Sequence, residues 1–268
     1  MWTNISGAMS KTLLIAGLAV GLCSLTLNVL LGRALLAAFA ELQYARIFPV
    51  EPPDGARSAG ASAVTGTACI AMFGDSRVLM WGAGALGREC PVRNFGRGGF
   101  TSSQLLMQLQ TVERPRTRWS IVQIGINDIH PIGALPDYKE AVLAGLHSNF
   151  AAVVGRLLQR SDFVIVSTII PPGHVPLRRR LFWDPSTLAY VADVNQSIRL
   201  AARRDRIFLL DAAVLLKGSD GYLDPQYADS DFFLHINQRA YDVLNAAVLR
   251  ILRSVPAETN TGPNNSTE

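Results

Sequence analysis

Short apolar segments alternate with longer segments of helical periodicity over most of the chain, and this alternation restricts the fold more than any other feature. Apolar, strand-like segments occur at residues 67–73, 91–95, 119–124, 163–170 and 207–211. Helical patterns occur at residues 103–111, 137–159, 186–203 and 238–253. Alternating strands and helices are typical of a parallel sheet with helices on both faces. We therefore predict an α/β domain, a flavodoxin-like three-layer α/β/α fold with a five-stranded parallel sheet.

An apolar stretch near the N-terminus predicts a transmembrane helix. Residues 12–32 make up 21 residues with few polar side chains, and as a helix they would extend about 31 Å, which is enough to span a bilayer. A cleaved signal peptide is the alternative, with residues 38–40 (Ala-Phe-Ala) as the cleavage site. We favour the uncleaved anchor, because the stretch is longer than the apolar core of a signal peptide and Arg33 interrupts the approach to the cleavage site.

Composition divides the chain into four parts. They are a membrane anchor with a juxtamembrane helix (residues 1–50), a linker rich in Pro, Gly, Ala and Ser (51–66), the α/β domain (67–255) and a disordered polar tail (256–268). The charges beside the span do not orient the anchor, because Lys11 lies on one side of it and Arg33 and Arg46 on the other.

The charge and the cysteines limit the partners that we expect. The formal net charge is +4 and no basic run is interleaved with aromatic residues, so we expect no nucleic-acid partner. Cys23 lies in the apolar stretch, whereas Cys69 and Cys90 lie at the starts of the first two predicted strands. Neighbouring strands would bring these two close enough for a disulfide; two buried thiols are the alternative, and the one that we favour. No Cys or His spacing resembles a zinc site, so we expect no metal.

Four polar blocks follow one another along the chain, the first three of them beside the ends of predicted strands. They are Phe73-Gly74-Asp75-Ser76-Arg77, Asn94-Phe95-Gly96-Arg97-Gly98-Gly99-Phe100-Thr101, Gly125-Ile126-Asn127-Asp128 and His235-Ile236-Asn237. Doubly wound sheets bind ligands beyond the carboxyl ends of their strands, so we expect the first three blocks at one edge of the sheet. In this order the blocks resemble those of the SGNH/GDSL hydrolases, and the resemblance covers roughly residues 67–253.

The resemblance implies a serine hydrolase site that needs no metal or organic cofactor. Ser76 would be the nucleophile and His235 the base, because a serine hydroxyl is a weak nucleophile until its proton is removed during attack. The backbone N–H groups of Ser76 and Gly99 and the side-chain amide of Asn127 would form the oxyanion hole. A glycine lets the backbone approach the substrate closely, and a neutral amide donates without changing the protonation of the base.

The third member of the expected triad departs from the family pattern. The family usually carries Asp three residues before its histidine, and here Phe232 holds that position. Asp231 lies one residue further from His235, and we expect a bulge to bring its carboxylate to the histidine. The alternatives are Asp229 as a substitute, or a Ser-His dyad in which a backbone carbonyl holds the ring.

Four further residues are candidates for substrate binding, namely Arg77, His130, Arg179 and Trp183. Arg77 would either contact substrate or pair with a surface carboxylate, and His130 lies just after the Asn127 block. Arg179 and Trp183 belong to residues 171–184, which we expect to form an extended loop at the border of the site. A solvated basic turn is an equal alternative for this loop.

The function implied by the resemblance is that of a serine esterase for short acyl esters, in particular O-acetyl esters of an envelope carbohydrate. The predicted anchor indicates a single-pass protein of the cell membrane, and the resemblance implies that its catalytic domain lies outside the cytoplasm; a secreted or periplasmic protein after signal cleavage is the alternative. Two other functions would use the same fold. One is an O-acyltransferase, and the other is a non-catalytic, membrane-tethered glycan-binding protein, which the displaced Asp231 suggests.

Overall fold

The computed structural model describes residues 3–51, 69–111, 116–230 and 233–255. The chain forms two compact units, Met1–Ala45 and Arg46–Glu268. The predicted tail, the predicted linker apart from its first residue, and Asp231 lie outside the described residues.

A long helix, α1, spans Thr3–Ile47. From Leu13 onward it is long and apolar enough to cross a membrane, judged by length and composition. α1 is longer than the predicted span of residues 12–32, because the Leu- and Ala-rich sequence that follows consists of strong helix formers. The helix ends shortly before Pro49, which disfavours a helical conformation in the residue that precedes it.

A second segment, Pro136–Leu158, passes the same test of length and composition. It contains α6 (Lys139–Leu158), whose buried residues recur at helical spacing and include Val142, Leu146 and Phe150. A helix with one buried face is typical of the core of a globular domain. We therefore assign α6 to the α/β domain.

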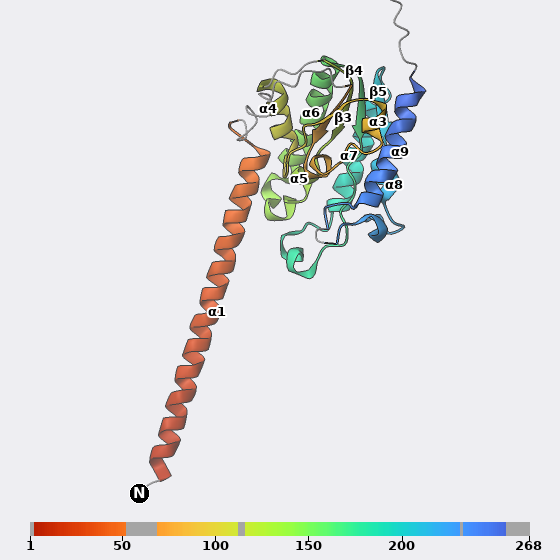
Figure 1. The fold of residues 1–268 in the computed structure, drawn as a ribbon. Helices are drawn as coiled ribbons and strands as arrows, with labels where there is room; N and C mark the ends of the chain where they lie inside the picture. The colour runs from red at the N-terminus through yellow and green to blue at the C-terminus, as the bar shows by residue number, and fades with distance from the viewer. Residues whose placement is uncertain (1–2, 52–68, 112–115, 231–232, 256–268) are drawn as a thin grey trace, which may run out of the picture. The chain divides into compact units, whose positions relative to one another are not determined.

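The described strands form one parallel sheet in the order β2-β1-β3-β4-β5 (Figure 1). They are β1 (Ile70–Gly74), β2 (Val92–Asn94), β3 (Thr117–Gln123), β4 (Ser161–Ser167) and β5 (Ile207–Leu210). β1 is buried at every position and β3 at nearly every one, as expected for strands covered on both faces. The flavodoxin-like order predicted from the sequence is confirmed, and its switch point lies between β1 and β3.

Helices cover both faces of this sheet (Figure 1). On one face α6 lies between α4 (Ser102–Thr111) and α7 (Thr187–Ala201), and on the other α9 (Gln238–Ser254) packs beside the short α3 (Leu86–Glu89). α9 buries Tyr241, Leu244 and Val248 in a core that also holds Met72 of β1 and Trp119 of β3. These α9 residues repeat every three to four positions and so form one apolar stripe. The predicted three-layer architecture is confirmed.

A disulfide joins Cys69 and Cys90, whose Cα atoms are 5.7 Å apart. The two buried thiols favoured from the sequence are therefore wrong. The pairing follows from the strand order, because β1 and β2 are adjacent and parallel. The backbone N–H of Cys69 donates to the Pro91 carbonyl over 3.0 Å, which places the two strand starts side by side.

Candidate active site

Ser76 is the first residue of α2 (Ser76–Leu79), directly after the turn that ends β1. Asp75 caps this helix, and its carboxylate accepts a hydrogen bond of 2.9 Å from the Arg77 backbone N–H. Gly74 has a φ of +155°, and a Cβ there would lie 2.0 Å from the carbonyl oxygen of Gln123. Only glycine fits this turn, which presents the Ser76 side chain at the carboxyl edge of the sheet.

The His235 ring meets the Ser76 hydroxyl, with 3.2 Å between Nε2 and Oγ. His235 lies just before α9, whose first turn is capped by the Asn237 side chain. The backbone carbonyl of His235 accepts a hydrogen bond of 3.1 Å from the Asp229 backbone N–H, which connects His235 to the residues that precede it in the chain. Ser76 and His235 are 159 positions apart in sequence, and the fold brings their side chains to hydrogen-bond distance.

The surroundings of His235 favour its neutral form. Burial first, and the positive charge of Arg77 second, lower the pKa of His235 below its usual value, while the negative charge of Asp229 acts in the opposite direction. A neutral imidazole can accept a proton from a neighbouring hydroxyl. Since Asp231 lies outside the described residues, its role as the orienting carboxylate stays a prediction.

Arg77 is buried and makes no ion pair with a surface carboxylate within the described residues, so its predicted contact with substrate stays a prediction. Its side chain is 1% exposed, so it lies beneath the site and not on the surface. The guanidinium donates to the carbonyl of Leu234 and to that of Ile170, each over 2.6 Å. Its own carbonyl accepts a hydrogen bond of 2.8 Å from the Tyr241 hydroxyl. Arg77 therefore ties the segment before His235 to the loop after β4.

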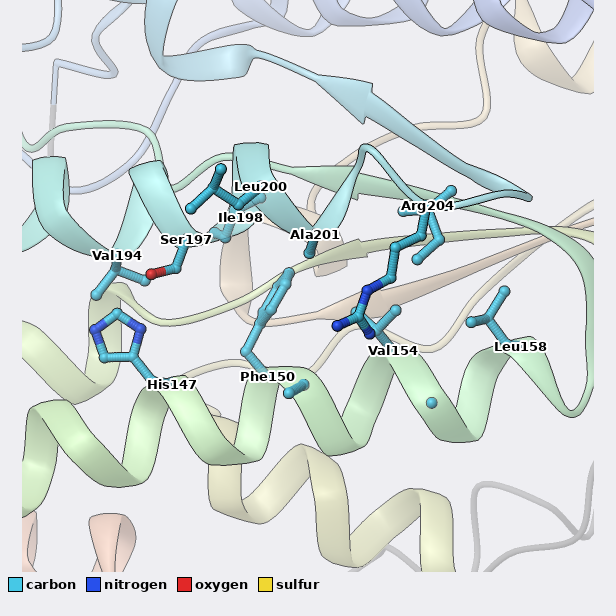
Figure 2. Close-up of a pocket in the computed structure, with 13 residues that line it drawn as sticks. His147, Phe150, Val154, Leu158, Val194, Ser197, Ile198, Leu200, Ala201 and Arg204 are labelled. Carbon is cyan, nitrogen blue, oxygen red and sulfur yellow. The ribbon is translucent and has the colours of Figure 1, made fainter.

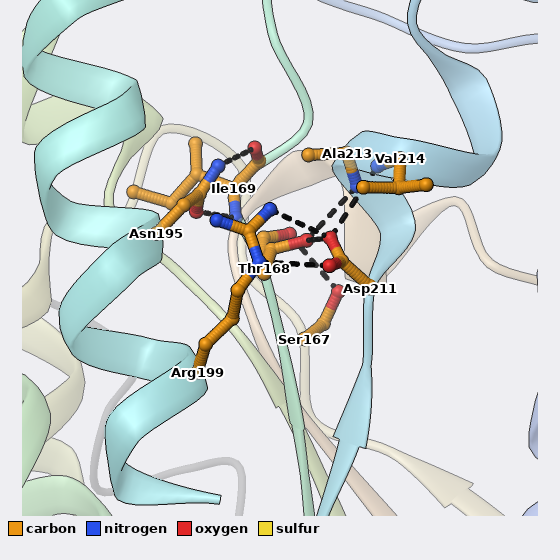
Figure 3. A network of polar contacts seen from close by, with 8 residues as sticks. All are labelled: Ser167, Thr168, Ile169, Asn195, Arg199, Asp211, Ala213 and Val214. Atoms are coloured by element: carbon orange, nitrogen blue, oxygen red, sulfur yellow. Dashed lines mark hydrogen bonds and ion pairs between the residues drawn. The ribbon is translucent and has the colours of Figure 1, made fainter.

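A polar network fixes the carboxyl ends of β4 and β5 (Figure 3). The Asp211 carboxylate accepts hydrogen bonds from Arg199 Nε over 2.8 Å and from Thr168 Oγ1 over 3.1 Å. Asn195 of α7 bonds both backbone groups of Ile169, accepting from its N–H over 2.6 Å and donating to its carbonyl over 2.9 Å. The exit of β4, where the Ile170 carbonyl accepts a hydrogen bond from Arg77, is thus held by side chains of α7 and by Asp211, the residue after β5.

The predicted oxyanion donors Gly99 and Asn127 lie near each other at this edge. Asn127 belongs to α5 (Ile126–Ile129), and its Nδ2 donates to the carbonyl of Phe100 over 2.9 Å. Gly99, the residue before Phe100, has a φ of +72°, a left-handed conformation that glycine adopts without strain. The Asn127 amide therefore connects α5 to the loop of residues 95–101, which we call the glycine loop.

Asp128 is a buried carboxyl group to which no sequence pattern assigns a role. It accepts hydrogen bonds from the backbone N–H of Ser102 over 3.0 Å and from its hydroxyl over 2.6 Å. Burial raises the pKa of Asp128 to about 7, while the hydrogen bonds from Ser102 act to lower it. These contacts join α5 to the start of α4 beneath the glycine loop. Its place next to Asn127 in the third polar block is the one sequence signal that points to it.

His130, Arg179 and Trp183 lie at the border of the site. His130 follows α5, and burial, with the positive charge of Arg179 as the second cause, lowers the pKa of His130 to about 4. Arg179 belongs to the 3₁₀ helix η4 (Leu177–Phe182), and the Trp183 ring packs edge-on against Phe233, with centroids 5.3 Å apart. The segment thus borders both the His130 and the His235 loops, although part of it is helical and not extended.

A hollow of about 400 Å³ lies elsewhere, between α6 and α7 (Figure 2). Apolar side chains such as Phe150, Val154 and Ile198 line it, with Ser197 near one end. None of the predicted site residues that the structure describes lines this hollow, so the Ser76 site is a separate feature. Within the residues that the structure describes, no group of three His, Cys, Asp or Glu side chains is placed to hold a metal ion.

Comparison with known proteins identifies a family and a shared fold. A family model for the GDSL-like lipase/acylhydrolase family matches residues 59–243. No curated protein matches the chain. Among solved structures, a Streptococcus pneumoniae protein described under the name platelet activating factor has a TM-score of 0.60 at 17% identity, and covers 85% of this chain and 99% of its own.

Two further solved structures share the fold. A GDSL-like lipase from Bacteroides thetaiotaomicron has a TM-score of 0.53 at 18% identity, over 69% of this chain and 87% of its own. An acetylxylan esterase from Geobacillus stearothermophilus has a TM-score of 0.52 at 18% identity, over 69% of this chain and 94% of its own.

Proposed function

The chain belongs to the GDSL-like lipase/acylhydrolase family and is a carboxylic ester hydrolase, and we propose that it is a serine esterase that removes short acyl groups, chiefly O-acetyl groups, from an envelope carbohydrate. The observation that carries the proposal is the 3.2 Å contact between Ser76 Oγ and His235 Nε2. A nucleophile and a base within hydrogen-bond distance are the minimum that acyl transfer through serine requires.

In the proposed mechanism Ser76 Oγ attacks the ester carbonyl carbon while His235 Nε2 takes the hydroxyl proton. The tetrahedral intermediate collapses, the C–O bond to the alcohol breaks, and His235 returns the proton to the leaving oxygen. A water molecule, deprotonated by His235, then attacks the carbonyl carbon of the acyl-enzyme. The bond between this carbon and Ser76 Oγ breaks, His235 returns the proton to Ser76 Oγ, and the carboxylic acid leaves. Asp231 is proposed to orient the imidazole.

The negative charge of the intermediate would be stabilised by the backbone N–H groups of Ser76 and Gly99 and by the Asn127 amide. Asn127 supports this role, because one amide hydrogen is used by the Phe100 carbonyl and the primary amide has a second hydrogen to donate. The same hydrogen bond would hold the amide and the glycine loop in fixed relative positions. Pre-positioned donors are effective because they need no reorganisation during the reaction.

The acetylated carbohydrate is supported by the shared fold with an acetylxylan esterase and by the polar and aromatic border formed by His130, Arg179 and Trp183. The test is a hydrolysis assay with the full-length chain in non-ionic detergent, using 4-nitrophenyl esters of graded chain length and acetylated xylan. We expect the acetyl ester to be the best substrate of the series. Product formation only with an added sugar acceptor would identify an acyltransferase, and glycan binding without turnover would identify a binding protein.

The rate of hydrolysis is expected to depend on the protonation of His235. Only the neutral ring can act as base, so kcat/KM should rise with pH through the pKa of His235, which lies below its usual value of about 6.5. The measurement is kcat/KM for 4-nitrophenyl acetate against pH, corrected for spontaneous hydrolysis. In wild type, kcat/KM is expected to reach half of its maximum below about pH 6.5. The control His147→Gln should give the same midpoint, because His147 lies on α6 and its ring contacts Asp193 of α7. A midpoint above that pH would contradict the assignment.

We further propose that α1 remains as an uncleaved anchor and that the domain lies outside the cytoplasm. The Cys69–Cys90 disulfide supports this location, because disulfides persist in oxidising compartments. Protein from membrane fractions is expected to retain the residues before Glu41 and, without reductant, to yield a peptide linked through these two cysteines. Cys23, which is free, should be alkylated after denaturation and serves as the control. A mature chain that begins at Glu41, or alkylation of all three cysteines, would contradict the proposal.

A further inference from the structure

Residues 46–48, which begin the second compact unit, pack beside the glycine loop. The carbonyl of Arg46 accepts a hydrogen bond of 2.7 Å from the Thr101 hydroxyl, and the carbonyl of Ile47 accepts one of 2.6 Å from the Ser103 hydroxyl. The Ile47 side chain is 5% exposed, and the Phe48 ring lies 6.2 Å from the Tyr138 ring. Residues 46–48 are therefore packed on the domain at the start of α4.

This packing places the Arg46 guanidinium next to Gly99. A Cβ built on Gly99 would lie 3.6 Å from one terminal nitrogen of Arg46 and 3.9 Å from its Cζ. The Arg46 side chain is exposed, and its guanidinium makes no hydrogen bond or ion pair within the described residues. A solvent-accessible cation thus lies beside a residue that we assign to the oxyanion hole.

The electrostatic environment of this border is positive. Apart from burial, which is the main cause, the charges of Arg179, Arg46 and Arg77 all act to lower the pKa of His130. Arg179 comes from η4 and Arg46 from the end of α1, so two segments far apart in sequence bring positive charge to the same residue. A cleft lined by one sign of charge raises the local concentration of ligands of the opposite sign.

We propose that Arg46 binds an anionic group of the substrate, a carboxylate or a phosphate, beside the oxyanion hole, so that the enzyme prefers acidic acylated carbohydrates to neutral ones. This inference rests on the proposed esterase function and names its substrate class. A guanidinium suits the task because its planar fork pairs with two oxygens of a carboxylate or phosphate. The juxtamembrane segment then has a second role, since it supplies part of the substrate site as well as the connection to the anchor.

The test compares acetyl esters of similar size that differ in charge, with the full-length chain in non-ionic detergent. 4-Acetoxybenzoate carries a carboxylate, 4-acetoxyphenyl phosphate carries a phosphate, and 4-acetoxybenzamide is the neutral reference. The measured quantity is the ratio of kcat/KM for an anionic ester to kcat/KM for the neutral one. We expect a ratio above one in wild type, about a tenfold lower ratio in Arg46→Gln, and an intermediate ratio in Arg46→Lys, because a hydrogen bond between charged groups contributes about a factor of ten.

Arg88→Gln is the matched control, because Arg88 is an exposed arginine of α3, and its ratio should equal that of wild type. If Arg46→Gln lowers kcat/KM for all three esters equally, Arg46 only shapes the loop and the inference is wrong. If Arg46→Gln keeps the wild-type ratio of kcat/KM values but binds anionic vesicles more weakly, Arg46 contacts lipid headgroups, and the inference is also wrong. Wild type that hydrolyses none of the esters would instead contradict the proposed function, so the two failures are distinct.

Discussion

Ser76→Ala is expected to lower kcat for ester hydrolysis by at least about 10⁴-fold, because it removes the only atom proposed to form the acyl-enzyme. The measurement is the initial rate on 4-nitrophenyl acetate with the full-length chain, together with release of acetate from acetylated xylan. Substrate binding should persist, since the proposed oxyanion donors and the border residues remain. A residual rate above that of water would come from these groups alone.

Two variants make the Ser76 result specific. Ser197→Ala changes an exposed serine of α7 beside the apolar hollow (Figure 2) and should leave the rate as in wild type. His235→Gln should lose about as much activity as Ser76→Ala, and the double variant should lose little more, because a nucleophile and its base act as one unit. Hydrolysis that survives Ser76→Ala would place the nucleophile elsewhere and end the proposed mechanism.

Local signals were enough to predict the sheet and the position of Ser76. The apolar run before Gly74 forms a buried strand, and the Gly-Asp-Ser sequence forces a turn whose geometry depends only on adjacent residues and on the neighbouring strand. The order of the strands follows the general topology of doubly wound sheets. The approach of His235 to Ser76 is what the family resemblance of the polar blocks implies, and the structure places their side chains 3.2 Å apart.

Residues whose partners are backbone atoms far away in sequence were not predicted. In the sequence Arg77 resembles a surface charge, yet its guanidinium binds backbone carbonyls 93 and 157 positions away. Every residue has a backbone carbonyl, so the residue type does not indicate which one an arginine will bind. Arg46 reads as the flanking charge of a membrane span, and its place beside Gly99 depends on two hydroxyls of the α4 start. Both positions depend on tertiary packing and not on any local pattern.

Arg77→Ala is expected to destabilise the α/β domain strongly. The substitution removes the donors for the buried carbonyls of Ile170 and Leu234 and leaves a cavity, which together should lower the free energy of unfolding by about 3–5 kcal/mol. The measurement is urea unfolding of the full-length chain in detergent, followed by tryptophan fluorescence. Trp81 and Trp119 are buried in the domain core and would report its unfolding. Arg88→Ala, on the surface, should change the free energy of unfolding by less than about 0.5 kcal/mol.

Arg77→Lys separates the structural role of Arg77 from the substrate contact that its position in the sequence suggests. An ammonium group keeps the charge but is a compact donor, and it cannot reproduce the guanidinium's fork between the loop after β4 and the segment before His235. The expected result is therefore an intermediate loss of stability with a lower kcat, because His235 would be held less firmly against Ser76. Normal stability of Arg77→Ala together with a raised KM would show instead that the side chain binds substrate. The burial of Arg77 argues against that outcome, since a side chain that is 1% exposed reaches no ligand without a rearrangement of the loops it holds together.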